Sequence, residues 1–137
     1  MDQPPGARHK NYSGRAVYHK KFDLPAAVPN DRRLWLDLGE VDDVADVRLN
    51  GRDLGVVWTQ PARVDITGAV RAKDNDLEVT VVNLWPNRLI GDAALPKASR
   101  FTETNIHKFG PASPLLPSGL IGPVRLLTTE SPSVEAQ

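Results

Sequence analysis

Much of the chain alternates apolar and polar residues with a period of two, the pattern of half-buried β-strands. Residues 34–38 place three leucines on one side and Trp and Asp on the other, and residues 45–49 carry Ala, Val and Leu on a single face. Asn50-Gly51 follows, and this pair favours the φ > 0 of a tight hairpin. The sequence therefore predicts a β-hairpin whose return strand covers residues 53–58.

Further segments with the same alternation extend this scaffold. Strands are expected at residues 16–24, 61–64, 76–83 and 123–129, with Lys20 interrupting the apolar face of the first one. Asp65 can cap one helical turn over residues 65–71. Short strands at roughly ten-residue spacing indicate an all-β fold, an antiparallel β-sandwich. We expect a single domain over residues 14–129, with flexible ends at 1–13 and 130–137.

Residues 84–122 break this regularity. The segment is rich in Pro, Asn, Ser and Gly and is far longer than the usual connection of about 4–6 residues. Its large apolar residues are too numerous for a solvated tail; they are Trp85, Phe101, Ile106, Phe109, Leu115 and Leu116. We expect an ordered loop that crosses one end of the sandwich and carries the function.

Composition narrows the function classes. The 137 residues include 17 Lys plus Arg and 17 Asp plus Glu, without long blocks of like charge, so nucleic acid and anionic membranes are not expected partners. The absence of Cys excludes disulfides and thiolate chemistry. No signal peptide and no run of about 20 apolar residues is present, which predicts a soluble chain of unknown compartment.

Metal binding is weakly indicated. His9, His19 and His107 lack zinc-site spacing, so we expect no zinc. An acidic cluster could offer oxygen ligands to Ca²⁺; it consists of Glu40, Asp42, Asp43 and Asp46. Without the spacing of a calcium loop, a solvated turn is the favoured interpretation, and no cofactor is expected.

Two groups of motifs resemble known carbohydrate-enzyme domains. Residues 38–55, with their Val-x-Leu-Asn-Gly-x-x-Leu-Gly hairpin, and residues 75–81 are similar to the galactose-binding-like jelly-roll domains of family 2 glycoside hydrolases. Residues 83–92, 101–105 and 113–126 together resemble the C-terminal β-sandwich of family 106 α-L-rhamnosidases. The likeness covers about residues 12–128, nearly the whole chain.

This resemblance implies a jelly-roll sandwich, a carbohydrate ligand and a catalytic (β/α)₈ barrel as a partner. In those enzymes the catalytic carboxylates lie on the barrel, which this chain lacks, so the expected role is that of an accessory domain. Two alternatives stay open. One is a small stand-alone glycoside hydrolase that uses Asp92 and Glu103 as its carboxylate pair. The other is a protein-interaction module.

The resemblance also implies a site. In family 2 β-galactosidases an Asp in the corresponding loop contacts sugar, and Asn87 falls at that position. Trp85 could stack on a pyranose, and Arg88 could donate hydrogen bonds to it. The predicted sugar-contacting end consists of Trp58, Trp85, Asn87, Arg88, Asp92, Glu103 and Asn105.

A structural interpretation of the same residues competes with the sugar site. In it Trp85 plugs the sandwich end, Asn87 caps a turn, and Arg88 pairs with Asp92 or Glu103 to fix the loop. Residues 113–123 are apolar and return the chain to the closing strand. If part of this segment faces a barrel in multidomain relatives, the isolated chain should expose an apolar patch that favours self-association.

Overall fold

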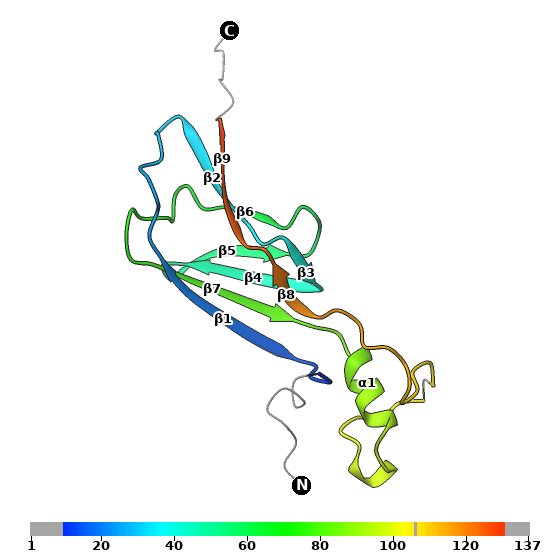
Figure 1. Ribbon diagram of the computed structural model, residues 1–137. Helices are drawn as coiled ribbons and strands as arrows, with labels where there is room; N and C mark the ends of the chain where they lie inside the picture. The colour runs from blue at the N-terminus through cyan, green and yellow to red at the C-terminus, as the bar shows by residue number, and fades with distance from the viewer. Residues whose placement is uncertain (1–9, 106, 131–137) are drawn as a thin grey trace.

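A computed structural model describes residues 10–105 and 107–130 (Figure 1). Strands dominate, and the only α-helix among these residues is short. In chain order the elements are β1 (Arg15–Phe22), β2 (Arg32–Asp37), β3 (Glu40–Asp42), β4 (Val44–Leu49), β5 (Arg52–Val57), β6 (Arg63–Asp65), β7 (Asn75–Val82), α1 (Pro86–Ala93), the 3₁₀ turn η1 (Lys97–Ser99), β8 (Gly119–Gly122) and β9 (Arg125–Glu130). The expected flexible ends lie mostly outside the described residues.

The strands form antiparallel sheets, as the alternation predicted. One sheet has the order β1-β7-β4-β5, a second has the order β6-β2-β9, and β3 pairs with β8. Leucines 34 and 36 of β2, together with Val47 of β4 and Val79 of β7, are buried between the sheets. The all-β sandwich is thereby confirmed, and its core comes from the inward faces that the sequence pattern identified.

The hairpin between β4 and β5 also forms as predicted. Asn50 and Gly51 have φ values of 54° and 78°, the left-handed backbone that a tight hairpin turn needs. The Asn50 side chain then bonds beyond its own hairpin: Nδ2 donates to the Ala69 carbonyl and to Asn75 Oδ1, and Oδ1 accepts from the Asp76 N–H. The turn is thus tied to the start of β7.

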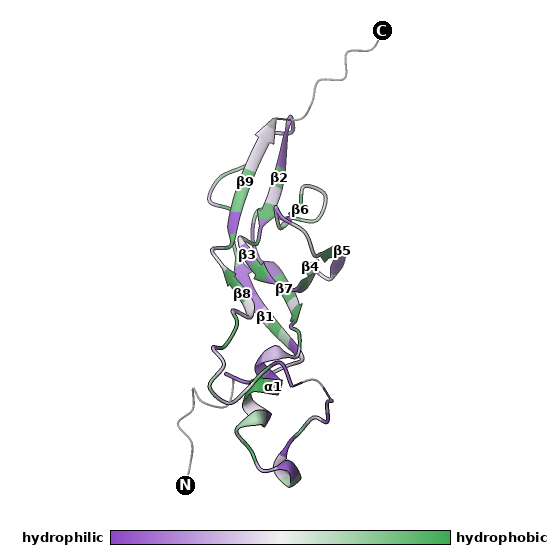
Figure 2. Ribbon diagram, turned by 90° about the vertical axis from the view of Figure 1, so that its right-hand side faces the viewer, coloured by the Kyte–Doolittle hydropathy of each residue, from purple (hydrophilic) through white to green (hydrophobic). Residues whose placement is uncertain are grey.

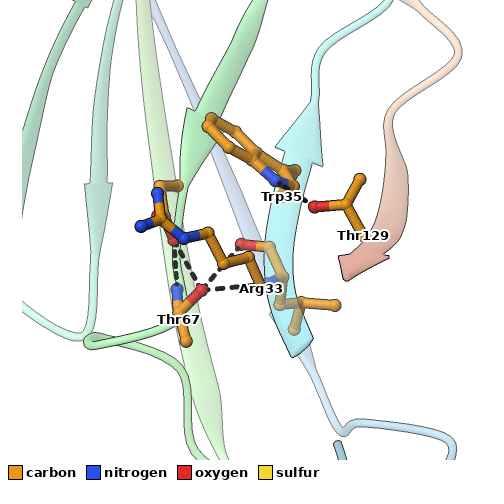
Figure 3. Close-up of polar contacts among 6 residues, drawn as sticks. Arg33, Trp35, Thr67 and Thr129 are labelled. Carbon is orange, nitrogen blue, oxygen red and sulfur yellow. Dashed lines mark hydrogen bonds and ion pairs between the residues drawn. The ribbon is translucent and has the colours of Figure 1, made fainter. Parts of the chain in front are cut away.

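Side chains hold strand β2 on the side of β6 and on the side of β9 (Figure 3). Thr67 Oγ1 accepts a hydrogen bond from the Leu34 N–H at 2.9 Å and donates to Asp65 Oδ1 at 2.6 Å. On the side of β9, Trp35 Nε1 donates to Thr129 Oγ1 at 3.0 Å. These contacts fix β2 between its two partner strands.

A close backbone approach connects the end of β2 to the β8–β9 corner. Gly39 has φ +67°, and a Cβ at this position would lie 2.5 Å from the carbonyl carbon of Gly122. The Gly122–Pro123 peptide bond is cis. A residue with a side chain at 39 would meet both a strained backbone and an occupied space.

The helical content differs from the prediction. The Val70 N–H donates to the Ile66 carbonyl and the Thr67 N–H donates to Asp65 Oδ1, so residues 65–71 contain the single turn that Asp65 was expected to cap. Helix α1, by contrast, begins at Pro86, where we expected irregular loop. Strand β7 ends at Val82, before Pro86, and this proline instead begins the helix, where its missing N–H is not needed. Both views place α1 and its loop at one end of the molecule, away from the outer ends of β2 and β9 (Figures 1 and 2).

Within the described residues, no helix is long and apolar enough to cross a membrane.

Candidate functional site

Helix α1 organises the end of the sandwich. It follows β7 through residues 83–85, and its buried residues are Asn87, Ile90 and Asp92. Two of these three carry polar side chains, which is unusual for a buried helix face and requires partners for each of them. Both partners come from the long segment that follows the helix.

The first partner is the backbone near residue 116. Asn87 is 6% exposed; its Nδ2 donates to the Leu116 carbonyl at 2.8 Å, and its Oδ1 accepts from the Leu116 N–H at 2.8 Å. The Asn87 amide thereby makes the two hydrogen bonds to the Leu116 backbone that a neighbouring β-strand would otherwise make. Because both amide atoms are used, Asn87 serves the chain's own loop in this structure.

The second partner is Thr102. Asp92 Oδ2 accepts from the Thr102 N–H at 2.8 Å and from the Thr102 hydroxyl at 2.6 Å. Its Oδ1 lies 3.0 Å from an Arg88 Nη2, one helical turn earlier, and this ion pair lacks the alignment of a hydrogen bond. The Arg88 guanidinium also lies over the Phe101 ring, 4.7 Å from its centroid. The contacts match the structural alternative in which Arg88 pairs with Asp92 to fix the loop.

Asp92 is buried, and its surroundings set its charge. Burial alone would raise the pKa of this carboxyl, but the hydrogen bonds from Thr102 and the positive charge of Arg88 outweigh burial and hold its pKa below the usual range. A general acid in a glycosidase needs a raised pKa. Asp92 therefore lacks the property that the stand-alone glycosidase hypothesis requires of one member of the carboxylate pair.

A cavity of about 610 Å³ opens between α1 and the segment after it. Three of the predicted site residues, Asp92, Glu103 and Asn105, contribute to its lining. The rest of the lining comes mainly from residues that the predicted site did not include; among them are Leu89, Lys97, Arg100, Thr102, Thr104, His107 and Phe109. Leu89, Thr102 and Thr104 lie within the segments that resemble family 106 enzymes, but neither this resemblance nor any spacing gave these residues a role in binding.

The other predicted site residues lie elsewhere. Trp85 is 61% exposed at the start of α1, and Trp58 is 74% exposed. Trp58 lines a separate hollow of about 250 Å³, and Asn87 lines another of about 290 Å³. Asp43 borders both hollows, and its carboxylate accepts a hydrogen bond from the Leu84 N–H at 2.7 Å. The seven predicted residues thus surround one end of the sandwich but do not form a single cleft.

Asn83, just before α1, connects three segments. Its Oδ1 accepts from the Gly14 N–H at 2.7 Å, while its Nδ2 donates to the Tyr12 carbonyl and to the Ser118 hydroxyl. Asn11 also packs in the space beside Gly91 of α1. The start of the described chain is therefore attached to the same end as the cavity.

The acidic cluster stays dispersed around the β3 turn. Asp42 Oδ2 and Asp46 Oδ1 are buried and accept no hydrogen bond from the described residues. In that described part of the chain, no group of three or more His, Asp or Glu side chains is arranged to hold a metal ion.

The β-sandwich, with α1 and its loop at one end, agrees with the domain family that the sequence matches. Residues 9–108 match the family model for the glycosyl hydrolase 2 galactose-binding domain-like family, so the chain belongs to that family. A protein from Formosa agariphila named "Putative beta-glucuronidase" is 49% identical over 88 residues, which make up 64% of this chain and 8% of that protein.

Solved structures agree with this assignment. The rhamnosidase from Novosphingobium sp. PP1Y superposes with a TM-score of 0.79 at 47% identity, over 88% of this chain and 11% of that one. The β-glucuronidase from Bifidobacterium dentium gives a TM-score of 0.51 at 30% identity, over 59% of this chain and 13% of that one. The chain thus spans about a tenth of the length of these relatives.

Proposed function

We propose that this chain is the non-catalytic, saccharide-contacting β-sandwich of a rhamnosidase-like glycoside hydrolase, and that it works beside a catalytic barrel. The observation that carries the proposal is the cavity between α1 and residues 97–105 and 107–111. Its volume is in the range of small-molecule sites, and amide, hydroxyl and carboxylate groups line it together with aromatic Phe109. Such groups suit the hydroxyls and the apolar faces of a sugar ring.

The rhamnosidase-like part of the proposal has separate support. The TM-score to the Novosphingobium rhamnosidase exceeds that to the B. dentium β-glucuronidase. The residues that connect α1 to its loop also belong to the segments that resemble family 106 enzymes, namely 83–92 and 101–105. The loop end, rather than the sandwich alone, therefore favours this relationship.

The state of Asp92 supports a non-catalytic role. Asp92 is bound by Thr102 and Arg88, and its pKa is lowered, so it does not supply a proton at neutral pH. Glu103 is exposed on the cavity rim. Its carboxylate can accept a hydrogen bond from a sugar hydroxyl. Asp92, the other carboxyl of the lining, is not suited to act as a general acid beside it.

The test is calorimetric titration of the full chain with rhamnose-containing and galactose-containing oligosaccharides. We expect saturable binding without release of reducing sugar, and about tenfold weaker binding in Asn105→Ala and in Glu103→Gln, because each loses a polar contact to the ligand. Asn30→Ala and Glu40→Gln are matched controls, since both residues are exposed and lie outside the cavity lining.

Three results would contradict the proposal. Absence of binding to every saccharide would remove the saccharide contact. Equal affinity in the cavity variants and their controls would show that the saccharide binds to another surface. Release of reducing sugar that stops in Glu103→Gln would favour the stand-alone hydrolase.

A further inference from the structure

Two cations on the cavity lining have no counter-charge from the described residues. Lys97 begins η1 and Arg100 follows its last residue, so a single short turn presents both side chains. Neither forms an ion pair within residues 10–105 and 107–130, where four such pairs occur. Their charges are therefore available to a ligand that enters the cavity.

Arg100 is partly positioned for this task. Its Nε donates to the Leu95 carbonyl at 3.1 Å, which fixes the base of the guanidinium. The terminal nitrogens make no hydrogen bond to a described residue, and a planar guanidinium can hold a carboxylate or a sulfate through two parallel hydrogen bonds. Lys97 adds a second positive charge with three donors.

The carboxylates of the cavity do not cancel these cations. Arg88 and Thr102 already compensate the buried charge of Asp92. Glu103 is the other carboxylate of the lining, and it is exposed to solvent. Available positive groups thus outnumber available negative ones, and the lining favours an anion over a neutral ligand.

We propose that the cavity binds a saccharide that carries an anionic substituent, either a uronate carboxylate or a sulfate ester, with Arg100 and Lys97 contacting the anionic group. Thr102, Asn105 and Phe109 border the same space and contact the neutral part of the sugar. This inference rests on the proposed saccharide function and specifies its ligand class.

The experiment compares acidic and neutral ligands of equal length on the full chain. Calorimetric titrations use tri-galacturonate, a sulfated galactose trisaccharide and an unsubstituted galactose trisaccharide. One or both acidic ligands should bind about tenfold more tightly than the neutral one, and the two acidic arms tell carboxylate from sulfate. The preference should decrease from low to high ionic strength, because the cations are exposed and salt screens them.

Variants tie this preference to the cavity. The double variant Lys97→Gln, Arg100→Gln should bind the acidic and the neutral ligands equally, while its affinity for the neutral ligand stays within about twofold. Lys73→Gln, Arg71→Gln is the matched control, because both residues are exposed and lie outside the cavity lining. Circular dichroism and thermal unfolding of all variants verify that each one is folded.

The outcomes separate the two proposals. Equal affinity for acidic and neutral saccharides overturns the anionic preference and leaves the saccharide function intact. An acidic preference that survives in the double variant overturns the assignment to Lys97 and Arg100. If free sulfate or acetate competes for the cavity as strongly as the acidic saccharides do, the cavity is an anion site that does not recognise sugar. Absence of binding to all three ligands, while a rhamnose-containing oligosaccharide binds, overturns the anionic preference alone. Absence of binding to every saccharide overturns both proposals.

Discussion

The Asn87 side chain exchanges two hydrogen bonds with the backbone of Leu116, 29 residues further along the chain. An amide side chain presents a donor and an acceptor side by side, which is the arrangement that a neighbouring β-strand offers to a backbone residue. Helix α1 therefore holds the returning loop as a strand would. Asp92 performs the same task for Thr102, ten residues away, with its carboxylate.

Replacing Asn87 by Ala should loosen the return of the loop. The Leu116 N–H and C=O would lose their partners, and we expect a loss of about 2–3 kcal/mol in the free energy of unfolding. Hydrogen exchange should rise in residues 94–118 and stay constant in β4 and β7. Asn30→Ala is the control. A variant with unchanged unfolding and exchange would show that the paired hydrogen bonds contribute nothing to stability.

Acid should weaken the attachment at Asp92. Its folded-state pKa is lowered, so its contribution is fully present above the unfolded pKa of about 3.9 and is lost as the pH falls through the folded value. Thr102→Val removes one of the hydrogen bonds that lower this pKa. We expect it to cost about 1–2 kcal/mol at neutral pH and progressively less below about pH 4.

Urea unfolding at several pH values measures this difference. Thr59→Val, at an exposed position outside the loop, is the control. A cost that stayed constant down to pH 2 would mean that the Thr102 hydroxyl acts through packing and not through the charge of Asp92.

Asn75 should be a strong determinant of stability. It is fully buried, its Oδ1 accepts from Asn50 Nδ2 and the Arg71 N–H, and its Nδ2 donates to the Arg71 carbonyl. Asn75→Ala leaves several buried polar groups unpaired, and we expect a loss of about 3 kcal/mol. Thermal and chemical unfolding measure it, with Asn30→Ala again as control. A loss below about 0.5 kcal/mol, the size of surface effects, would contradict this role.

Gly39 should not tolerate a side chain. Gly39→Ala combines a positive φ with a Cβ that meets the Gly122 backbone, and we expect a loss of at least about 2 kcal/mol in stability. Gly110→Ala is the matched control, because no atom lies within 4 Å of its Cβ position and its φ is not positive. Equal stability of the two variants would mean that the corner relaxes freely.

The exposed apolar surface near α1 should promote self-association of the isolated chain. Leu84, Trp85 and Leu116 are 63%, 61% and 47% exposed, and Leu84 and Leu116 border one hollow. Leu84→Ser, Trp85→Ser should shift sedimentation toward the monomer at high concentration. Val56→Ser, exposed on β5, is the control. An unchanged distribution would indicate that this surface does not drive association.

The sequence predicts the sandwich well because its information is local. A period of two identifies the buried faces of β2, β4 and β7, and Asn50-Gly51 fixes the register of a hairpin. It fails at α1 because a Pro after a strand is expected to start a loop, whereas Pro86 occupies the first position of a helix. A helix of this length is also stabilised by tertiary contacts more than by its own propensity.

The site is predicted less well because its contacts depend on loop geometry. The sequence predicted a site that contains Asp92, Glu103 and Asn105, which border one cavity. The same predicted site included Trp58 and Trp85, which do not line that cavity. It gave no role to Arg100, since a lone cation in a loop carries no spacing signal. Whether Asn87 faces a ligand or its own chain depends on where Leu116 lies, and no local pattern encodes that.

The two attachments on α1 separate the task of folding from the task of selecting a ligand. Residues 97–105 and 107–111 supply much of the cavity lining. Most of them lie between Thr102 and Leu116, the two points at which α1 holds the segment. Homologous domains could therefore exchange this stretch, in length as well as in chemistry, while the β-scaffold stays unchanged. Under the proposed function, grafting the stretch from one relative to another should change which saccharide is bound.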